Sequence, residues 1–473
     1  MNKKMSLISQ FENWLFKITW DKQIAFLLEG ITILIHYKRF IDTLNLLKKS
    51  QYWSKNQIEE FQFKKLKELL THSYKNVPYY KKIFDDNRIK PEDIKNLNDF
   101  QKIPFLTKEI IKIKLNEIKA KNYPDYKFGY ITTGGSTGTP VGIYEEKNVS
   151  NVLDIAFYKF FYSWIGGKLS DKFVYIRGNV IYGSEKGKFW KYFYFHRGLS
   201  LSSYHMTDEN LKLYVKKIRK FRPKYIVAYP SSLYILAKYM KKNKIKPFST
   251  LKFILCGAEN LYDWQKDFFK EIFKCNIYES YGHTERAVIA FTCEKSGNFH
   301  ISPIYGYTEL IGKDGKLVTK ENEVGEIVTT GLLNFLWPLI RYKTGDMGVL
   351  TTKKCECGRN FFTLKKIEGR SNQDFVITKN KRLISMTAMN MHSNVFDNVA
   401  QFQFYQDKIG VVEFHLVKMK SYTDKDTQYI RQELLKKLGS DVDLKIKFLK
   451  DIPKTPRGKQ KFLEQKLPIN LEK

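Results

Sequence analysis

The chain has 473 residues, with 82 Lys and Arg against 49 Asp and Glu, which gives a formal charge of +33 at pH 7. Apolar residues make up 43% and charged residues 28%, a globular composition that excludes a wholly disordered chain. Five cysteines in so long a chain exclude a disulfide scaffold. The length suggests about three domain-sized units, with enough chain to bury a core without covalent staples.

No apolar run reaches the roughly 18 to 20 residues that are needed to span a bilayer. The nearest candidate, residues 24–35, is short and carries Glu29. Residues 1–22 contain acidic and aromatic residues and no small-residue cleavage site, so they do not indicate a secretion signal. We therefore expect a cytoplasmic protein.

The lysines are spread over nearly every segment instead of forming one stripe. Such a spread is typical of a solvated surface, and it does not favour a specific nucleic-acid interface. The excess of positive charge still attracts polyanions, among them ATP and anionic membrane surfaces. Peripheral contact with a membrane therefore stays open.

Residues 1–120 are predicted to be mainly helical. The segment 54–70 begins with a suitable N-cap, Ser54, and repeats apolar residues at helical spacing until residues 76–80 (NVPYY) interrupt it. From Lys127 onward, short β-rich runs alternate with amphipathic helices. Strands are expected at 172–177, 225–228, 252–256 and 275–279, with helices at 209–220 and 231–242. This alternation predicts βαβ units and a parallel sheet.

The pattern changes again near Gly369. Residues 401–406, 411–417 and 443–449 are predicted strands and residues 424–438 a helix, which together make a small α+β unit. We place the boundary at 368–372, so that residues 1–369 form a large domain, with 121–369 as its core, and residues 370–473 a small one. The predicted fold class is α/β: a large domain with mostly parallel sheets and flanking helices, then a small mobile α+β domain.

Three motifs of the predicted core suit a nucleotide. Residues 132–140 (TTGGSTGTP) combine hydroxyls with glycines that let backbone N–H groups turn toward an anion, but they lack the ending of a Walker loop. Residues 281–285 (YGHTE) offer a hydroxyl and a carboxylate after a strand. Residues 341–346 (RYKTGD) end in an Asp that suits ribose hydroxyls. Each motif alone also fits an ordinary loop or turn.

Two further segments complete an ordered series. Gly369 and Arg370 follow the core, and residues 453–459 (PKTPRGK) present a lysine about 90 residues further on. In this order and spacing the sequence resembles the adenylate-forming superfamily, specifically the phenylacetate–CoA ligase branch and its CapK-type relatives. Residues 76–80 and 255–260 (LCGAEN) also resemble that branch. The resemblance extends over nearly the whole chain.

The resemblance implies a complete ATP site. It assigns the β- and γ-phosphates to Thr133, Gly135, Ser136, Thr137 and Gly138, the adenine side to Gly257, Ala258, Glu259, Tyr281 and Gly282, and the ribose to Asp346 with support from Arg370. It also implies that Thr284 bonds the α-phosphate, that Glu285 holds Mg²⁺, and that Lys459 is the mobile catalytic lysine.

Elementary electrostatics agrees with these roles. Joining a carboxylate to an α-phosphate brings two anions together, and a lysine and Mg²⁺ offset the repulsion as charge develops. A lysine on a small separate domain allows closure for adenylation and withdrawal for acyl transfer. Two positions depart from the superfamily pattern: Asn372 stands where a hinge Asp or Lys is usual, and Val141 follows the loop proline, where lysine is common.

A zinc site is a separate prediction. Cys293 and His300 lie seven residues apart, and Cys355 and Cys357 form a Cys-x-Cys-Gly motif. Zinc prefers four tetrahedral sulfur or nitrogen ligands, and these residues would supply Cys₃His; some relatives in the branch carry a similar set. Because the spacing is not that of a standard finger, reduced cysteines with a surface histidine remain the alternative. The expected role of the zinc is structural.

The acyl pocket is expected between the adenine side and the parallel sheet, with Tyr204, His205, Tyr229 and His283 as its lining. The leading hypothesis is that the protein forms an acyl-adenylate with ATP and passes the acyl group to the thiol of CoA or to an amine. The CapK-type resemblance favours a role in surface-polysaccharide biosynthesis. The alternative is a non-catalytic basic scaffold that docks on a membrane or polyanion. The acid, the acceptor and the oligomeric state stay open.

Overall fold

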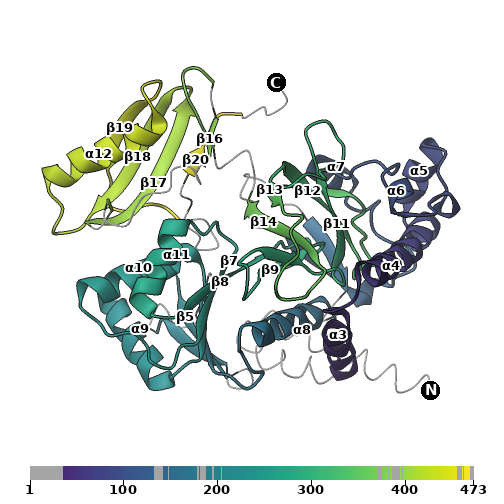
Figure 1. Cartoon of the computed structure of the whole chain (residues 1–473), viewed down its shortest axis with the longest axis horizontal. Coiled ribbons are helices and arrows are strands. Elements are labelled where there is room, and N and C mark those ends of the chain that lie inside the picture. Colours follow the sequence, from purple (N-terminus) through teal and green to yellow (C-terminus); the bar gives the residue numbers. More distant parts are fainter. Residues whose placement is uncertain are drawn as a thin grey trace.

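The computed structural model describes residues 36–132, 142–146, 149–177, 181, 188–193, 197–203, 205–369, 375–381, 383–385, 395–396, 398–454, 461 and 463–468 (Figure 1). In these ranges a large sheet with flanking helices carries most of the chain, and a smaller sheet with one long helix follows toward the C-terminus. No helix in the same ranges is both long enough and apolar enough to cross a membrane.

The N-terminal part is helical, as the sequence predicts. Its elements are α3 (Tyr37–Ser50), α4 (Lys55–Asn76), α5 (Pro78–Asp86), η1 (Pro91–Asp93), α6 (Leu97–Phe100), α7 (Lys108–Lys114) and η2 (Asp125–Lys127). Ser54 caps α4 as expected: its side chain accepts from the N–H of Gln57, whose side chain accepts from the N–H of Ser54. The NVPYY segment separates α4 from α5, because Val77 is extended and Pro78 begins the next helix.

A twelve-stranded sheet forms the centre of the large part, in the order β11-β12-β13-β14-β10-β9-β8-β7-β6-β3-β5-β4. Its strands are β3 (Phe173–Arg177), β4 (Trp190–Phe193), β5 (Gly198–Ser202), β6 (Tyr225–Ala228), β7 (Phe253–Gly257), β8 (Asn276–Gly282), β9 (Ile289–Thr292), β10 (Phe299–Ile301), β11 (Gly306–Ile311), β12 (Val324–Gly331), β13 (Tyr342–Leu350) and β14 (Phe362–Glu368). A separate antiparallel pair, β1 (Phe128–Thr132) and β2 (Gly142–Glu146), brings Thr132 opposite Gly142, at the two ends of the predicted phosphate loop.

The parallel half of the sheet confirms the βαβ prediction. Strands β5, β3, β6, β7 and β8 are parallel, with α9 (Asp208–Phe221), α10 (Pro230–Lys242) and α11 (Asp263–Phe273) as connections. The other pairs of the sheet are antiparallel, so the expectation of mostly parallel sheets holds for this half only. From β11 to β14 the connections contain no helix, and such connections favour antiparallel pairing.

The two faces of the parallel half are covered by different helices. In β6, Ile226 and Ala228 belong to the hydrophobic cluster beneath α9, α10 and α11. Tyr225 and Val227 face the other way and pack with α8 (Val149–Trp164) and its Phe161. Since successive side chains of a strand alternate between faces, residues of odd number in β3, β6 and β7 lie on the α8 face.

The C-terminal part confirms the small α+β unit. It consists of β15 (Phe375–Ile377), β16 (Leu383–Ser385), β17 (Val399–Lys408), β18 (Val411–Lys418), α12 (Asp424–Leu438), β19 (Asp443–Phe448) and β20 (Leu463–Gln465). Four of these strands form a sheet in the order β19-β18-β17-β20, and α12 has the predicted bounds. Its core includes Phe404, Phe414 and Ile430, all fully buried or nearly so.

The C-terminal part lies against α10 and α11, as Figure 1 shows. Trp264 of α11 packs with the rings of Phe396 and Phe402. Lys238 of α10 donates to the main-chain oxygens of Phe396 and Val399. These contacts position the C-terminal part beside the carboxyl ends of the parallel strands, where ligands bind in open α/β sheets.

Candidate active site

Two of the predicted nucleotide residues meet directly. Tyr281, near the end of β8, donates from Oη to Oδ2 of Asp346 in β13 at 2.7 Å. Burial and the neighbouring Asp346 raise the pKa of Tyr281 well above its usual value, so its phenol remains a hydrogen-bond donor. The residues expected at the adenine and the ribose therefore form one unit.

Glu285 is buried and held by two partners. Its Oε1 accepts from Oη of Tyr342 at 2.8 Å, and its Oε2 lies 3.4 Å from Nδ1 of His283. Burial alone would raise the pKa of Glu285, but His283 and the hydrogen bond from Tyr342 outweigh it and leave that pKa below its usual value. The protein thus maintains a carboxylate at this point. Hard oxygen ligands of this kind suit Mg²⁺.

Thr284 and Glu285 line one pocket together with residues of β2 and α8. Arg286 also lines this pocket and pairs with two of its carboxylates. Its Nη1 lies 3.1 Å from Oε2 of Glu145, and its Nε lies 3.3 Å from Oδ2 of Asp154. Burial raises the pKa of both carboxyls, and Arg286 opposes the rise. The arginine therefore ties the YGHTE segment to the strand that follows the predicted phosphate loop, a link that the motif analysis missed.

Other residues assigned to the adenine side lie at the ends of β7 and β8. Ala258 has φ of 66°, in the left-handed region, and turns the chain out of β7. Glu259 accepts from N and Oγ of Ser231 at 3.0 and 3.1 Å. Because Ser231 lies in the first turn of α10, this carboxylate also caps that helix. Gly282 is the exposed last residue of β8.

Of the described candidates for the acyl pocket, His283 lies beside Glu285, whereas His205 and Tyr229 flank the end of β3. Nδ1 of His205 lies 2.9 Å from Oγ of Ser202. The main-chain oxygen of His205 accepts from Nδ2 of Asn210 at 3.0 Å. Tyr229 is buried directly after β6, with its ring centroid 5.5 Å from the guanidinium carbon of Arg177. Since β5 and β6 both pair with β3, His205 and Tyr229 lie on either side of that strand's end.

Gly257 makes room at the same edge. A Cβ at this position would lie 2.6 Å from Oγ of Ser280 and 3.1 Å from Nη2 of Arg177, so only glycine lets both side chains approach β7. Arg177 was not singled out by the motifs, because an arginine that ends a strand carries no local signal of its role.

Several predicted residues lie outside the described residues. They are Thr133, Gly135, Ser136, Thr137, Gly138 and Val141 of the phosphate loop, Tyr204 of the acyl side, Arg370 and Asn372 near the predicted boundary, and the lysine Lys459. Lys454, in the same PKTPRGK segment as Lys459, is described: its Nζ donates to the main-chain oxygen of Ser203 at 2.7 Å. This end of the segment therefore contacts the turn after β5.

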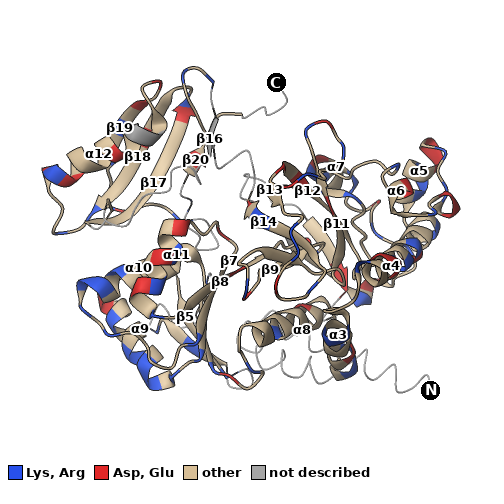
Figure 2. Ribbon diagram, viewed as in Figure 1, with Lys and Arg blue, Asp and Glu red and all other residues tan. Residues whose placement is uncertain are grey.

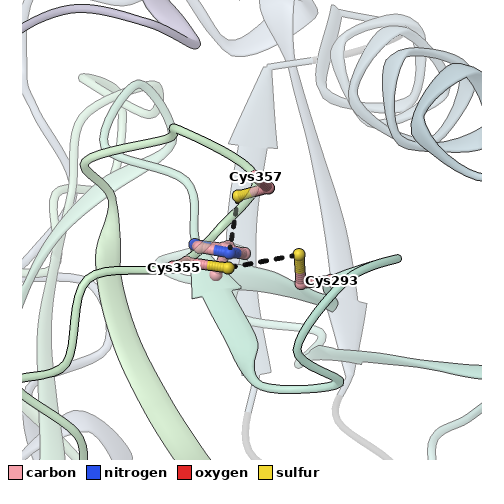
Figure 3. A group of neighbouring side chains, drawn as sticks. Cys293, Cys355 and Cys357 are labelled. Atoms are coloured by element: carbon pink, nitrogen blue, oxygen red, sulfur yellow. Dashed lines mark hydrogen bonds between the residues drawn. The ribbon is translucent and has the colours of Figure 1, made fainter.

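The four predicted zinc ligands come together in space. Their ligand atoms all lie within 4.8 Å of one another, and Figure 3 shows the sulfurs of the three cysteines turned toward a shared space. Sγ of Cys293 lies 3.5 Å from Sγ of Cys355, and Sγ of Cys357 lies 3.4 Å from Nε2 of His300. Ligand atoms in a tetrahedral zinc site lie about 3.3–3.8 Å apart, given bonds of about 2.3 Å to sulfur and 2.0 Å to nitrogen. The donor set and its spacing fit zinc.

The surroundings of this cluster also suit a metal. Nδ1 of His300 lies 3.3 Å from Oγ1 of Thr363, and the N–H of Lys295 donates to Sγ of Cys293 at 3.3 Å. Burial, with a contribution from Arg359, lowers the pKa of His300 to about 4, so the imidazole is neutral at pH 7. Partners of this kind orient metal ligands.

Comparison with known proteins decides the family. The family model for AMP-binding enzymes matches residues 63–336, more than half of the chain, and the model for the CapK C-terminal domain matches residues 376–466. The chain belongs to the AMP-binding enzyme family. It is therefore an adenylate-forming enzyme, in the branch that holds CapK and the phenylacetate–CoA ligases.

Individual relatives agree with this placement in the AMP-binding family. The chain is 28% identical over 419 residues to a CapK protein of Staphylococcus aureus, a match that covers 86% of this chain and 89% of the relative. It is 25% identical over 358 residues to a phenylacetate-coenzyme A ligase of Thermus thermophilus, covering 68% and 72%. A solved 2-hydroxyisobutyryl-CoA ligase superposes with a TM-score of 0.70 over 88% of this chain and 91% of its own, at 14% identity, which confirms the fold.

Proposed function

We propose that this AMP-binding enzyme joins an organic acid to AMP and then passes the acyl group to a thiol or an amine. The observation that carries the proposal is the buried, ionised Glu285 next to Thr284, close to the Tyr281–Asp346 pair. A carboxylate kept charged in a buried position points to a cationic ligand, and the nucleotide phosphates of this family's substrate lie beside such a ligand.

Each of the described nucleotide-site residues has a role in this reaction. Asp346 accepts from the ribose hydroxyls, Tyr281 stacks on the adenine, and Thr284 donates to the α-phosphate. Glu285 would hold Mg²⁺, which supplies positive charge where the two anions meet. The acid needs no general base, because its carboxylate is ionised at pH 7. Positioning and charge neutralisation therefore account for the rate.

The C-terminal part supplies the remaining cation, Lys459, in our proposal. Lys454 anchors one end of its segment at Ser203, beside the candidate acyl residues. A lysine carried by a small unit can enter the site for adenylation and leave it for acyl transfer, so one surface serves two half-reactions. The boundary near residues 368–372 would be the hinge.

For the acyl acceptor, we propose the thiol of CoA or an amine. Among the relatives are enzymes named phenylacetate-coenzyme A ligases, whose names contain the thiol acceptor. The CapK relative and the CapK C-terminal match favour a place in the synthesis of a surface polysaccharide, where an amine is the natural acceptor for amide formation. We also propose that Cys293, His300, Cys355 and Cys357 bind a structural zinc ion.

A panel of carboxylic acids tests the proposal. The wild type should release pyrophosphate from ATP only when an acid is present, and CoA and amines offered separately should reveal the acceptor. Lys459→Ala should abolish release while ATP still binds, because the residue acts on the transition state rather than on the bound nucleotide. Lys461→Ala, in which a partly exposed lysine nearby is removed, is the matched control and should retain activity.

Full turnover in Lys459→Ala would remove that residue from the mechanism. Absence of both pyrophosphate release and ATP binding in the wild type would instead favour the non-catalytic scaffold. The charged, partnered Glu285 and the Tyr281–Asp346 pair argue against the scaffold. Burying a carboxylate costs stability, and docking on a surface does not require a buried carboxylate.

A further inference from the structure

Two of the three guanidinium nitrogens of Arg177 are shielded and have no polar partner in the described part of the chain. Its Nε and Nη2 atoms are closed off from solvent and have no hydrogen-bond partner among the described residues. The guanidinium carbon lies 5.5 Å from the ring centroids of both Tyr175 and Tyr229, so aromatic faces surround it. These rings stabilise a cation only modestly, and they leave the N–H donors of Nε and Nη2 unused.

The position of this cation coincides with the candidate acyl side. Arg177 is the last residue of β3 and lies on the α8 face, as do Gly257 of β7 and Ser280 of β8. The point where a Cβ of Gly257 would stand is 3.1 Å from Nη2 of Arg177 and 2.6 Å from Oγ of Ser280. Tyr281, the next residue along β8, faces the opposite way and meets Asp346. The strand itself therefore separates the guanidinium from the Tyr281–Asp346 pair.

The side chains grouped around Arg177 are tyrosines, which carry no charge at pH 7. Apart from burial, the neighbours that affect the pKa of Arg177 most are Tyr175, Tyr158, Tyr229 and Tyr162. The nearby acid Asp154 is already paired with Arg286. Leaving a shielded guanidinium unpaired is strongly unfavourable, unless a ligand brings the missing anion.

We propose that Arg177 binds a second anionic group of the acid substrate, a carboxylate or a phosphate, remote from the carboxylate that is adenylated. The inference rests on the proposed function. The reacting carboxylate has to stand beside Thr284, beyond the end of β8, and a fork of arginine donors would reduce its nucleophilicity. A second oxyanion on the α8 face leaves the reacting group unhindered and uses the planar donors of Arg177. The substrate class is thus a dicarboxylic or phosphorylated acid.

Matched acid pairs test this inference through carboxylate-dependent exchange of pyrophosphate into ATP. Butyrate against succinate, hexanoate against adipate, and lactate against phospholactate differ in the second anionic group. For the wild type, kcat/KM should be at least about 30-fold higher for the dianionic member of a pair, since a buried charge-assisted pair is worth about 2 kcal/mol or more. Arg177→Met should lose most of that preference and change the rate with monoanionic acids by less than about 3-fold.

Two further variants and a second measurement sharpen the result. Arg177→Lys should keep part of the preference, because it retains the charge but not the fork. Arg219→Met, which removes an exposed arginine of α9, is the matched control and should change nothing. The preferred dianionic acid should raise the unfolding temperature of the wild type and not that of Arg177→Met, while Arg177→Met without ligand should unfold no earlier than the wild type.

Equal kcat/KM for both members of every pair would overturn this inference and leave the adenylation proposal intact. An equal loss with monoanionic and dianionic acids in Arg177→Met would also overturn it, because Arg177 would then act on the reacting carboxylate. Absence of exchange with any acid in the wild type would overturn the proposed function, and this inference with it.

Discussion

The RYKTGD segment holds the YGHTE segment at two points. Tyr342 donates to Glu285, and Asp346 accepts from Tyr281. The RYKTGD segment is also anchored to β11, because the buried Arg341 donates to both carboxylate oxygens of Glu309, at 3.0 and 2.9 Å. Two motifs that look independent in the sequence thus form one unit, in which Glu285 and Tyr281 each have a hydrogen-bond partner in the other motif.

This arrangement predicts different consequences for the two partners of one hydrogen bond. Glu285→Gln removes the charge that would hold Mg²⁺, so adenylation should fall about 100-fold or more. Tyr342→Phe leaves the carboxylate but removes one donor to it, so the reaction should slow by about 3- to 10-fold and require more Mg²⁺. Pyrophosphate release measured across a range of Mg²⁺ concentrations checks both changes.

Tyr80→Phe is the control for losing a buried tyrosine hydroxyl. Oη of Tyr80 donates to the main-chain oxygen of Pro338 at 2.9 Å and accepts from the N–H of Ile340 at 3.0 Å. Its loss should lower stability by about 1 to 3 kcal/mol and leave the Mg²⁺ requirement unchanged. If Tyr342→Phe behaves in the same way as this control, Tyr342 does not serve the metal site.

For single residues, the sequence predicts which segments form the site better than it predicts which side chains pair with one another. Tyr281, Asp346 and Glu285 stand in recognisable segments, so their proximity could be expected from the resemblance. The donor Tyr342 could not, because it lies 57 residues from Glu285 and nothing local marks its direction. Arg177 was missed for the same reason, since a shielded, unpaired guanidinium is a property of packing.

At the scale of elements, the parallel strands were predictable and most antiparallel ones were not. Strands β6 and β7 are buried on both faces and therefore appear as short apolar runs between amphipathic helices. Strand β13 instead alternates buried and half-buried residues and contains the RYKTGD glycine and Asp, which are typical of a turn. Its pairing with β12 and β14 follows from tertiary packing rather than from local propensity.

The candidate zinc cluster joins the β9–β10 hairpin to the connection between β13 and β14. Cys293 and His300 flank the turn between β9 and β10, and Cys355 and Cys357 belong to the long connection between β13 and β14. His300 faces Thr363 across the β10–β14 pair. A zinc ion would therefore fix the connection to the hairpin, and the sequence spacing already pointed to the four residues that the structure brings together.

Metal analysis tests this prediction. Purified protein should contain about one Zn²⁺ per chain, and the double variant Cys355→Ser/Cys357→Ser should contain none. Removing two ligands should lower the unfolding temperature by about 4 °C, and chelation should do the same to the wild type. Cys275→Ser is the control, because this half-buried cysteine lies outside the cluster. A metal-free wild type that unfolds at the same temperature with and without added zinc would contradict the prediction.

At the scale of the molecule, several described residues join the C-terminal part to the large part. Lys238 and Lys454 do so through hydrogen bonds, and Trp264 through ring contacts. Lys238 and Lys454 donate to main-chain oxygens, which water can replace once the parts separate. Such an interface suits the docking and release that we propose for the C-terminal part.

The net charge belongs to the whole molecule as well. Figure 2 shows Lys and Arg on the N-terminal helices, on α9 and α10 and on the C-terminal part, with acidic residues among them. Exposed pairs such as Lys81–Asp85 and Lys65–Glu68 neutralise the charge locally. The formal charge of +33 should therefore produce a long-range attraction for polyanions without a defined binding surface.

This distribution predicts weak, sequence-independent binding to DNA that salt removes. Fluorescence anisotropy with duplexes of unrelated sequence should give the same affinity for each of them at about 50 mM salt. The affinity should fall by about 10³-fold or more by 200 mM, because every phosphate contact releases counterions. The KM for ATP should change far less over that range, since the contacts proposed for Tyr281 and Asp346 with the nucleotide are directed and salt screens them little. Binding that survives 200 mM salt and distinguishes sequences would show that the basic residues form a specific nucleic-acid surface after all.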